Sequence, residues 1–264
     1  MCRGEPLSTG EALNTPAPRR QRSRLDHYGP WILGGGALLA GIAYEAARHH
    51  VFTRFQLIFF LLLVPTIVVH EVSHGVVAYW CGDDTAKSAG RLTLNPIRHI
   101  DPIGSVLVPI LLLVTTGSAF GWARPVPVSV HKLRHPRNQA VLVGLAGPFV
   151  NVLLALAAGF AFRGVADLNS IAGLPINSWP LGDEILFLFG EINVIIAVFN
   201  LIPIPPLDGS AVLERLMPRA WMPAYYRLRQ LSIILVLFLV FAAPGALNSL
   251  FNHALIYWGN IVGL

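Results

Sequence analysis

The sequence predicts an all-α membrane protein that crosses the bilayer five or six times. Of its 264 residues, 54% are hydrophobic and 12% are charged, whereas a globular domain carries about 25% charged residues. The apolar residues gather in several runs separated by short polar loops, which is typical of a chain that crosses a membrane repeatedly. The net charge of +5 comes mostly from arginines in these loops, so it indicates topology and not a nucleic-acid partner.

The chain divides into a polar start and a long apolar remainder. Residues 1–30 are polar and basic, so we expect a disordered cytoplasmic tail there and a single integral-membrane domain over residues 31–264. A transmembrane helix needs about 20 consecutive apolar residues, and five runs come near that length. The predicted spans cover about 31–47, 55–80, 140–162, 184–204 and 231–250.

The end of the chain leaves the number of crossings open. Pro244–Gly245 interrupts the fifth span, because proline lacks a backbone donor and its ring clashes inside a helix. Residues 252–264 either cross a sixth time or lie at the interface. Basic loops stay on the cytoplasmic side of a membrane, which predicts that the basic N-terminus is cytoplasmic too.

Residues 102–117, between the second and third spans, are apolar but short, with Pro109 in the middle. If they crossed the membrane, the loop 118–139 would be exported. That loop carries four basic residues and no acidic one, and the positive-inside rule opposes its export. We therefore expect 102–117 to form a re-entrant, membrane-associated segment.

The segment 55–82 carries the strongest functional signal. Its uncharged start leads directly into His70, Glu71 and His74, and apolar residues resume afterwards. Residues four apart share one face of a helix, so both imidazoles can bind one metal ion while Glu71 reaches a bound water, which is the H-E-x-x-H pattern of zinc hydrolases. Ionisable groups in an apolar helix are costly and usually mark a site. The alternative is a helix end whose histidines are hydrated at the interface.

Catalytic zinc commonly takes three protein ligands and keeps one position for water, so a third ligand has to come from elsewhere. Candidate third ligands in apolar territory are few: Glu191, Asp208 and, as the weakest, Asn151. Asp208 is favoured, because it follows the prolines that end the fourth span and lies at the depth that the topology gives His74. Its alternatives are an N-cap for a helix that begins at Gly209, or part of a turn. We expect one zinc ion per chain.

A proline-rich stretch between the second and third spans is a candidate for holding substrate. Gly121–Val130 alternates valine with proline, a pattern that suits an edge strand or an extended β-like ribbon and excludes a central strand. An edge beside an active site can bind an unwound peptide by strand addition. The alternative is a loop on the membrane surface. The residues assigned to substrate binding are Trp122, Pro125 and Val126 in this stretch and Asn151 in the next span.

The predicted chemistry is metal-assisted hydrolysis of a peptide bond. Zinc lowers the pKa of its bound water towards about 7, and Glu71 would take the water's proton and return it to the leaving amine. The developing oxyanion needs a donor, and Asn200, eight residues before Asp208, is a candidate for that donor. The alternative role of Asn200 is a structural hydrogen bond between helices.

These residues resemble the motifs of the site-2 proteases, a family of intramembrane zinc metalloproteases. The family's two motifs are matched, in order, by His70, Glu71 and His74 and by Asn200, Pro203, Asp208 and Gly209. The resemblance covers about 55–217 and is to the compact bacterial and archaeal type, without PDZ-like or cystathionine-synthase-type domains. It implies that His70, His74 and Asp208 bind zinc, that Glu71 is the catalytic base and that Asn200 assists near the scissile carbonyl.

The resemblance also implies where the protein works and on what. We expect a multi-pass protein of the prokaryotic plasma membrane that cleaves transmembrane segments of other membrane proteins, as in regulated intramembrane proteolysis. Its partners are then the lipid bilayer and a single-span substrate, with no nucleic acid. The identity of the substrate and the oligomeric state stay open.

Two other classes of protein compete with this interpretation. A metal transporter also places histidine and aspartate within a membrane, but no internal repeat is evident, and a transporter has no obvious need for Glu71 between two ligands. A catalytically inactive scaffold would be expected to have lost one of the four site residues, and all four are present. The sequence therefore favours the protease.

Overall fold

A computed structural model describes residues 54–108 and 123–264, all of which belong to one compact unit. These residues form helices joined by turns, and none of them is in a β-strand. The expected all-α class is thus confirmed for this part of the chain. The predicted tail 1–30, the first predicted span 31–47 and the candidate Trp122 lie outside the described residues.

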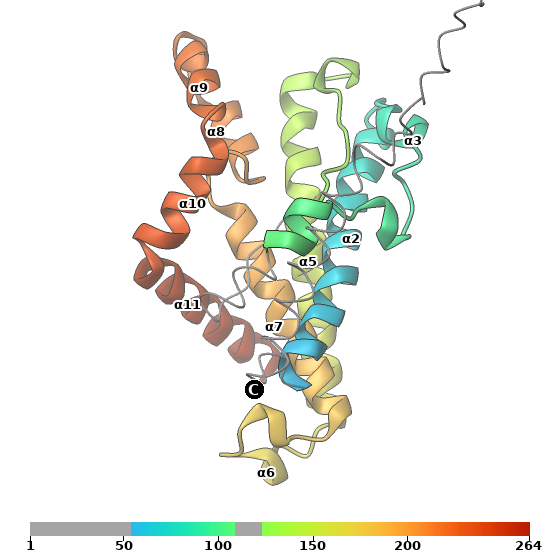
Figure 1. Cartoon of the computed structure of the whole chain (residues 1–264), viewed down its shortest axis with the longest axis vertical. Helices are drawn as coiled ribbons and strands as arrows, with labels where there is room; N and C mark the ends of the chain where they lie inside the picture. The colour runs from blue at the N-terminus through green and yellow to red at the C-terminus, as the bar shows by residue number, and fades with distance from the viewer. Residues whose placement is uncertain (1–53, 109–122) are drawn as a thin grey trace, which may run out of the picture. The chain divides into compact units, whose positions relative to one another are not determined.

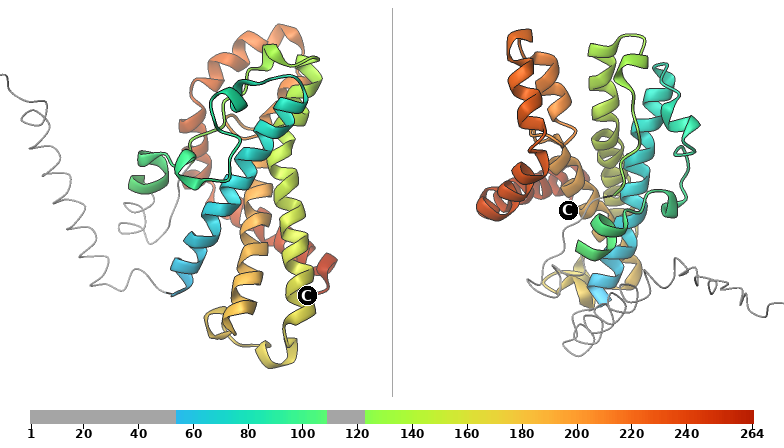
Figure 2. Two further views of the ribbon diagram at one scale, coloured as in Figure 1. Left: turned by 90° about the vertical axis from the view of Figure 1, so that its right-hand side faces the viewer. Right: turned by 45° about the horizontal axis from the view of Figure 1, so that its top comes forward.

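Three long helices form the centre of this unit: α2 (Arg54–Trp80), α5 (Pro136–Val165) and α7 (Leu181–Leu201). Each is long and apolar enough to cross a membrane, and α2, with 27 residues, is about 40 Å long. The three helices lie side by side, and each packs against the other two (Figures 1 and 2). They coincide with the second, third and fourth predicted spans to within a few residues.

Shorter helices make up the rest of the chain after α7. They are α8 (Ser210–Leu216), α9 (Met222–Arg229), α10 (Ser232–Ala242) and α11 (Pro244–Val262). Two helices therefore stand where the sequence predicts one span over 231–250. The break falls at Pro244, which cannot continue a helix from α10 but is well suited to the first position of α11.

The described residues contain part of the membrane crossings that the sequence predicts. α9 and residues 234–242 of α10 are bent by 72° and together are long and apolar enough for one broken span. By length and composition, the described residues thus contain three spans, or four if this bent pair is one. The expected five or six are not confirmed. Residues 252–262 belong to α11, which slants back from α10 towards α7 (Figure 1).

Trp258 fixes α11 to the three-helix centre. Its indole Nε1 donates a hydrogen bond to the carbonyl of Ala155 at 2.9 Å, and only 5% of the residue is exposed. The ring fills space that two glycines leave free, since a Cβ at Gly159 would lie 2.9 Å from it and one at Gly190 2.5 Å. Small residues allow such close approach of apolar helices.

The segment 123–129, which runs beside α2, contains no β-strand, so the edge strand that was one of the two expectations here is absent from these residues, while the extended ribbon stays a prediction. The reason is local. Pro125 and Pro127 have no backbone donor for a ladder. The N–H groups of Val126 and Ser129 are available, but they donate to carboxylates on and just after α2 instead.

The start of the predicted re-entrant segment is a short π-helix, η2 (Pro102–Leu107). The side chain of Asp101 caps it by accepting hydrogen bonds from the backbone N–H groups of Ile103 and Gly104, at 3.0 and 2.7 Å. Residues 109–117 lie outside the described part of the chain, so the re-entrant course stays a prediction.

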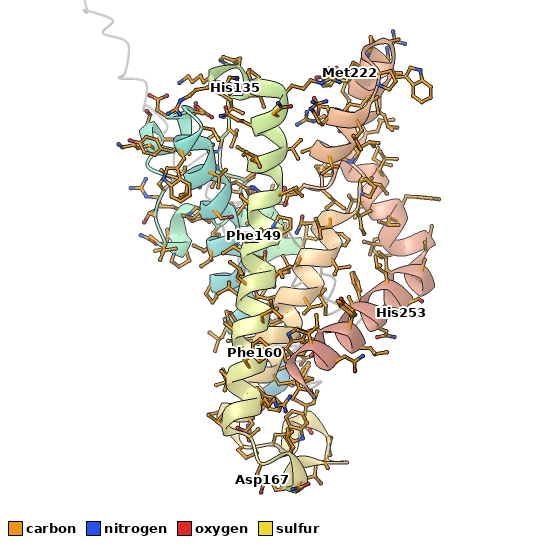
Figure 3. All side chains as sticks on the ribbon, turned by 180° about the vertical axis from the view of Figure 1, so that it is seen from behind. His135, Phe149, Phe160, Asp167, Met222 and His253 are labelled. Atoms are coloured by element: carbon orange, nitrogen blue, oxygen red, sulfur yellow. The ribbon has the colours of Figure 1, made fainter. Side chains whose placement is uncertain are left out.

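The described helices have two distinct ends. His135, at the start of α5, and Met222, at the start of α9, lie at one end, and Asp167 lies at the other (Figure 3). At the Asp167 end, Arg54 of α2 forms an ion pair with the fully buried carboxylate of Glu184 on α7. A buried charge needs such a partner, so this pair ties together the first turns of two spans.

The anchoring role of Trp258 can be tested by truncation. Trp258→Ala is expected to lower the free energy of unfolding by about 3–5 kcal/mol, because it leaves a cavity between α5, α7 and α11. The neighbouring Tyr257 is 69% exposed, so Tyr257→Ala is expected to change the free energy of unfolding by about 0.5 kcal/mol or less. Denaturant unfolding of the protein in detergent would measure both, and equal losses would contradict the anchor.

Candidate metal centre

Three of the predicted site residues meet at the middle of the structure. His70 and His74, one turn apart on α2, have their Nε2 atoms 3.2 Å from each other. Oδ2 of Asp208, from the turn between α7 and α8, lies 3.0 Å from Nε2 of His70 and 3.3 Å from Nε2 of His74. Both histidines are buried and the aspartate is partly so. The structure thus brings together the two motifs from different helices.

The turn that carries Asp208 is set by its neighbour Gly209. The N–H of Gly209 donates to the carbonyl of Asn200 at 2.6 Å, and a Cβ at this position would run into the backbone carbonyl of Leu201. Only glycine fits such a contact. The N-cap of α8 is Gly209, and α8 has no side-chain cap. The alternative role of Asp208 as an N-cap is therefore not what the structure has.

In each histidine, Nδ1, the ring nitrogen that does not face Asp208, forms a hydrogen bond with a residue of α5. Nδ1 of His74 lies 2.6 Å from the carbonyl oxygen of Val143, which can only accept, so this Nδ1 carries the hydrogen. Nδ1 of His70 lies 2.5 Å from Oδ1 of Asn151, an acceptor as well. In the neutral imidazoles, both Nε2 atoms then present lone pairs towards Asp208.

This arrangement fits a cation. Three electron-pair donors face one another, and the buried Oδ2 of Asp208 accepts no hydrogen bond, which is costly for a buried carboxylate. A bound cation removes the repulsion and satisfies all three atoms. Ligand atoms about 2.0–2.1 Å from zinc at tetrahedral angles lie about 3.3 Å apart, close to the separations of 3.0, 3.2 and 3.3 Å found here. The donor set and its size therefore suit zinc.

Asn151 does not face substrate, contrary to its predicted role. It is fully buried, and while Oδ1 lies against His70, its Nδ2 donates to Oδ1 of Asn193 on α7 at 2.7 Å. Asn193 in turn donates to Oγ1 of Thr66 on α2 at 3.3 Å. Because this chain of hydrogen bonds crosses all three long helices, Asn151 is a positioning residue for the His70 ring.

Glu71 lies beside the convergent donors and is tied to the proline-rich segment. Its Oε2 accepts a hydrogen bond from the N–H of Val126 at 2.9 Å. Glu71, Pro125 and Val126 all line an open cavity of about 1490 Å³, which also contains the two histidines and Asp208. A carboxylate has room for about four hydrogen bonds, so Glu71 can also hold a water in this cavity.

Asn200 lines the same cavity. Its Nδ2 donates to the carbonyl of Ile196, one turn earlier in α7, at 3.0 Å. The structural hydrogen bond that was the alternative for Asn200 is thus present, but it lies within one helix and does not join two. An amide has two N–H donors, so this bond leaves one for another partner.

Relatives of the chain identify its family. The model of Peptidase family M50 matches residues 177–243. YwhC of Bacillus subtilis (strain 168) is 40% identical over 158 residues, which cover 60% of this chain and 68% of YwhC. Rip2 of Mycobacterium tuberculosis (strain H37Rv) is 31% identical over 227 residues, 84% of this chain and 80% of Rip2. The chain belongs to peptidase family M50.

This membership confirms the predicted site-2 protease family, and with it a membrane metallopeptidase. Both relatives carry the name "Putative zinc metalloprotease". A more distant relative, "Zinc metalloprotease MJ0392" of Methanocaldococcus jannaschii, is 24% identical over 63% of this chain and 36% of its own length. No solved structure matches the chain significantly.

Gly147 is a part of this M50 site that the motifs do not contain. It lies on α5 against the histidine pair, and a Cβ there would lie 2.5 Å from Nε2 of both His70 and His74. Val143, Gly147 and Asn151 follow one another at intervals of four and so share one face of α5. In the sequence, the available signal was a glycine with Val143 and Asn151 four residues before and after it. The sequence does not say that this face of α5 meets the histidines.

The requirement for Gly147 is testable with a matched control on the same helix. Gly147→Ala is expected to push the two imidazoles apart and to weaken zinc binding about tenfold or more, the effect typical of changes next to metal ligands. Gly164, also on α5, has no atom within 4 Å of a built Cβ, so Gly164→Ala should bind zinc normally. Competition with a zinc chelator measures both affinities. Unchanged zinc affinity in Gly147→Ala would contradict the claim that a Cβ at this position displaces the two imidazoles.

Proposed function

We propose that this chain is a zinc-dependent intramembrane peptidase that hydrolyses peptide bonds within or near the transmembrane segments of membrane proteins. The observation that carries the proposal is the meeting of three electron-pair donors, His70, His74 and Asp208, beside the carboxylate of Glu71. They meet within a set of apolar helices and on the wall of a large cavity. A metallopeptidase with its site at this depth is suited to substrates that lie in the membrane.

His70, His74 and Asp208 would hold one zinc ion, with the ring of His70 oriented by Asn151 and that of His74 by Val143. Zinc in such a site supplies a Lewis acid and lowers the pKa of a bound water to about 7. Partners that fix the tautomer and orientation of a ligand also raise its basicity. The chain's own contribution is thus a rigid, oriented donor set that α2, α5 and the 202–209 turn share.

Glu71 would act as the proton carrier. It takes a proton from the attacking water and delivers it to the nitrogen of the leaving amine, so that one carboxylate serves as base and then as acid. The hydrogen bond from Val126 keeps its Oε2 in place, which holds the carboxylate in one orientation. Asn200 is the candidate donor for the oxyanion, through the N–H that Ile196 does not use.

The cavity supports a largely apolar substrate. Apart from the site residues, its walls come mainly from aliphatic and aromatic side chains, among them Phe59, Ile195, Phe199, Val240 and Phe251. The segment 123–129 borders it, and we assign Pro125 and Val126, together with Trp122, to substrate contact. A peptide that lies along this segment would be unwound, as attack on its backbone requires.

We retain the wider topology as part of this proposal. The membrane domain covers 31–264, with the N-terminus and basic loops in the cytoplasm, five to six crossings and a re-entrant segment over 102–117. The plasma membrane is the expected location. A transporter does not account for the place of Glu71, whose carboxylate lies beside the metal residues and is held there by a backbone donor.

Zinc content is the first measurement. Elemental analysis of the detergent-purified wild type should give about one zinc per chain, and His74→Ala and Asp208→Ala should both lose most of it, because each removes one of three ligands. Ser210→Ala, two residues after Asp208 and outside the donor set, should retain zinc. Normal zinc in Asp208→Ala would remove this residue from the site and with it the proposed geometry.

Glu71→Gln separates the chemistry from the metal. The amide keeps the size of the side chain but cannot accept the water's proton, so cleavage is expected to fall at least about 100-fold while zinc content stays at the wild-type level. Cleavage would be followed with tagged single-span membrane proteins reconstituted with the enzyme in liposomes. If Glu71→Gln cleaved them at the normal rate, the proposed proton carrier would be wrong.

A further inference from the structure

Positive charge gathers in a loop that lies near Glu71 but outside the donor set. Arg91 and Arg98 belong to the loop 91–101, which follows the short helix α3 (Thr85–Ser88) and contains the single 3-10 turn η1 (Pro96–Arg98). Arg124 joins them, since its N–H donates to the carbonyl of His99, the residue after Arg98, at 2.9 Å. A single backbone bond thus fixes the start of the proline-rich segment to this loop, and it places three arginines in one region.

Arg91 is the unusual member of this group. The residue is only 9% exposed, and its Nη1 is buried without a hydrogen-bond partner among the described residues. Burial, and then the neighbouring guanidinium of Arg124, lower the pKa of Arg91; Arg98 acts in the same direction and Glu71 opposes them. An unpaired buried cation beside two like charges is costly, and a bound anion would offset that cost.

The surroundings of the three arginines are those of a membrane interface. α2 ends in Tyr79 and Trp80, both exposed, and aromatic residues of this kind gather at the level of lipid headgroups. The loop and the start of η2 expose four large aliphatic side chains: Leu94, Ile97, Ile100 and Ile103. Basic and apolar side chains on one surface are typical of an element that lies between headgroups and acyl chains.

We propose that Arg91, Arg98 and Arg124 form a binding site for the phosphate headgroup of an anionic phospholipid. Guanidinium groups bind phosphate through paired hydrogen bonds; the exposed Arg98 and Arg124 would make these contacts, and the buried Arg91 adds positive charge behind them. The four aliphatic side chains would contact the acyl chains of the same lipid. A free phosphate ion shares the headgroup chemistry but has no use for these apolar contacts.

The site is connected to the peptidase centre through the backbone. Arg124, which would touch the headgroup, is two residues from Val126, whose N–H donates to Glu71. A bound lipid would therefore hold the segment that orients the carboxylate. Bilayer composition would affect the enzyme through this link, an effect that rests on the proposed role of Glu71, whereas the lipid binding itself does not depend on the proposed hydrolysis.

Lipid binding by the full chain in detergent, followed by native mass spectrometry, tests the proposal. The wild type should retain phosphatidylglycerol more strongly than phosphatidylcholine. Near a membrane surface each arginine contributes about 1 kcal/mol to binding of anionic lipid, so Arg98→Gln and Arg124→Gln should each lower the affinity for phosphatidylglycerol about fivefold. Both side chains are exposed, so the variants are expected to fold. Arg227→Gln, an exposed arginine of α9, is the matched control and should bind normally.

Several outcomes would overturn the site. Equal retention of the two lipids by the wild type would do so without any variant, as would an equal loss in Arg227→Gln. A third arm adds inorganic phosphate alone. The unfolding temperature of the wild type would be measured with phosphate and with phosphatidylglycerol. If phosphate displaced phosphatidylglycerol and raised the unfolding temperature as much as the lipid does, the arginines would form a site for free phosphate and the lipid assignment would be wrong.

Discussion

Repulsion among three electron-pair donors is the constraint on which the site depends. The two Nε2 lone pairs point at a carboxylate because Val143 and Asn151 hold the hydrogens on the opposite nitrogens. In water such groups would turn away or take up protons. Here packing around α2 and the hydrogen bonds to Val143 and Asn151 keep the two rings from turning away. The energy that this arrangement costs the empty protein is returned when a cation binds, which couples the fold to its metal.

Close helix packing makes the constraint possible. Gly147 lets α5 approach the imidazoles, Gly209 lets the aspartate turn fold back on the end of α7, and Gly190 receives the ring of Trp258. Each glycine acts through missing volume and not through an unusual backbone angle. Since apolar helices gain little from burying one another in lipid, contacts of this kind are a main source of association between them. The same residues therefore stabilise the fold and shape the site.

Much of the centre could be predicted from the sequence, and the reason is local. His70, Glu71 and His74 follow helical spacing, and Asp208 is marked by the prolines before it and the glycine after it. The residues that surround the metal ligands were harder to predict from the sequence. The carbonyl of Val143 is a backbone group that every residue carries, and the pairing of Asn151 with Asn193 depends on how α5 meets α7. The expected edge strand at 123–129 did not form, because Pro125 and Pro127 have no donor and the N–H groups of Val126 and Ser129 donate to carboxylates. The helix break at Pro244 was visible, but not the 72° bend between α9 and α10.

The bond between Val126 and Glu71 has a consequence for how this site could vary. The donor is a backbone N–H, so another buried apolar side chain at position 126 could replace Val126, which is 7% exposed, without losing the bond. Proline is the exception, because it alone lacks the hydrogen. Pro125 and Pro127 flank the donor on both sides, so an insertion or deletion of one residue upstream would bring a proline to this place. The register of the proline pattern, more than its composition, is what keeps the carboxylate in position.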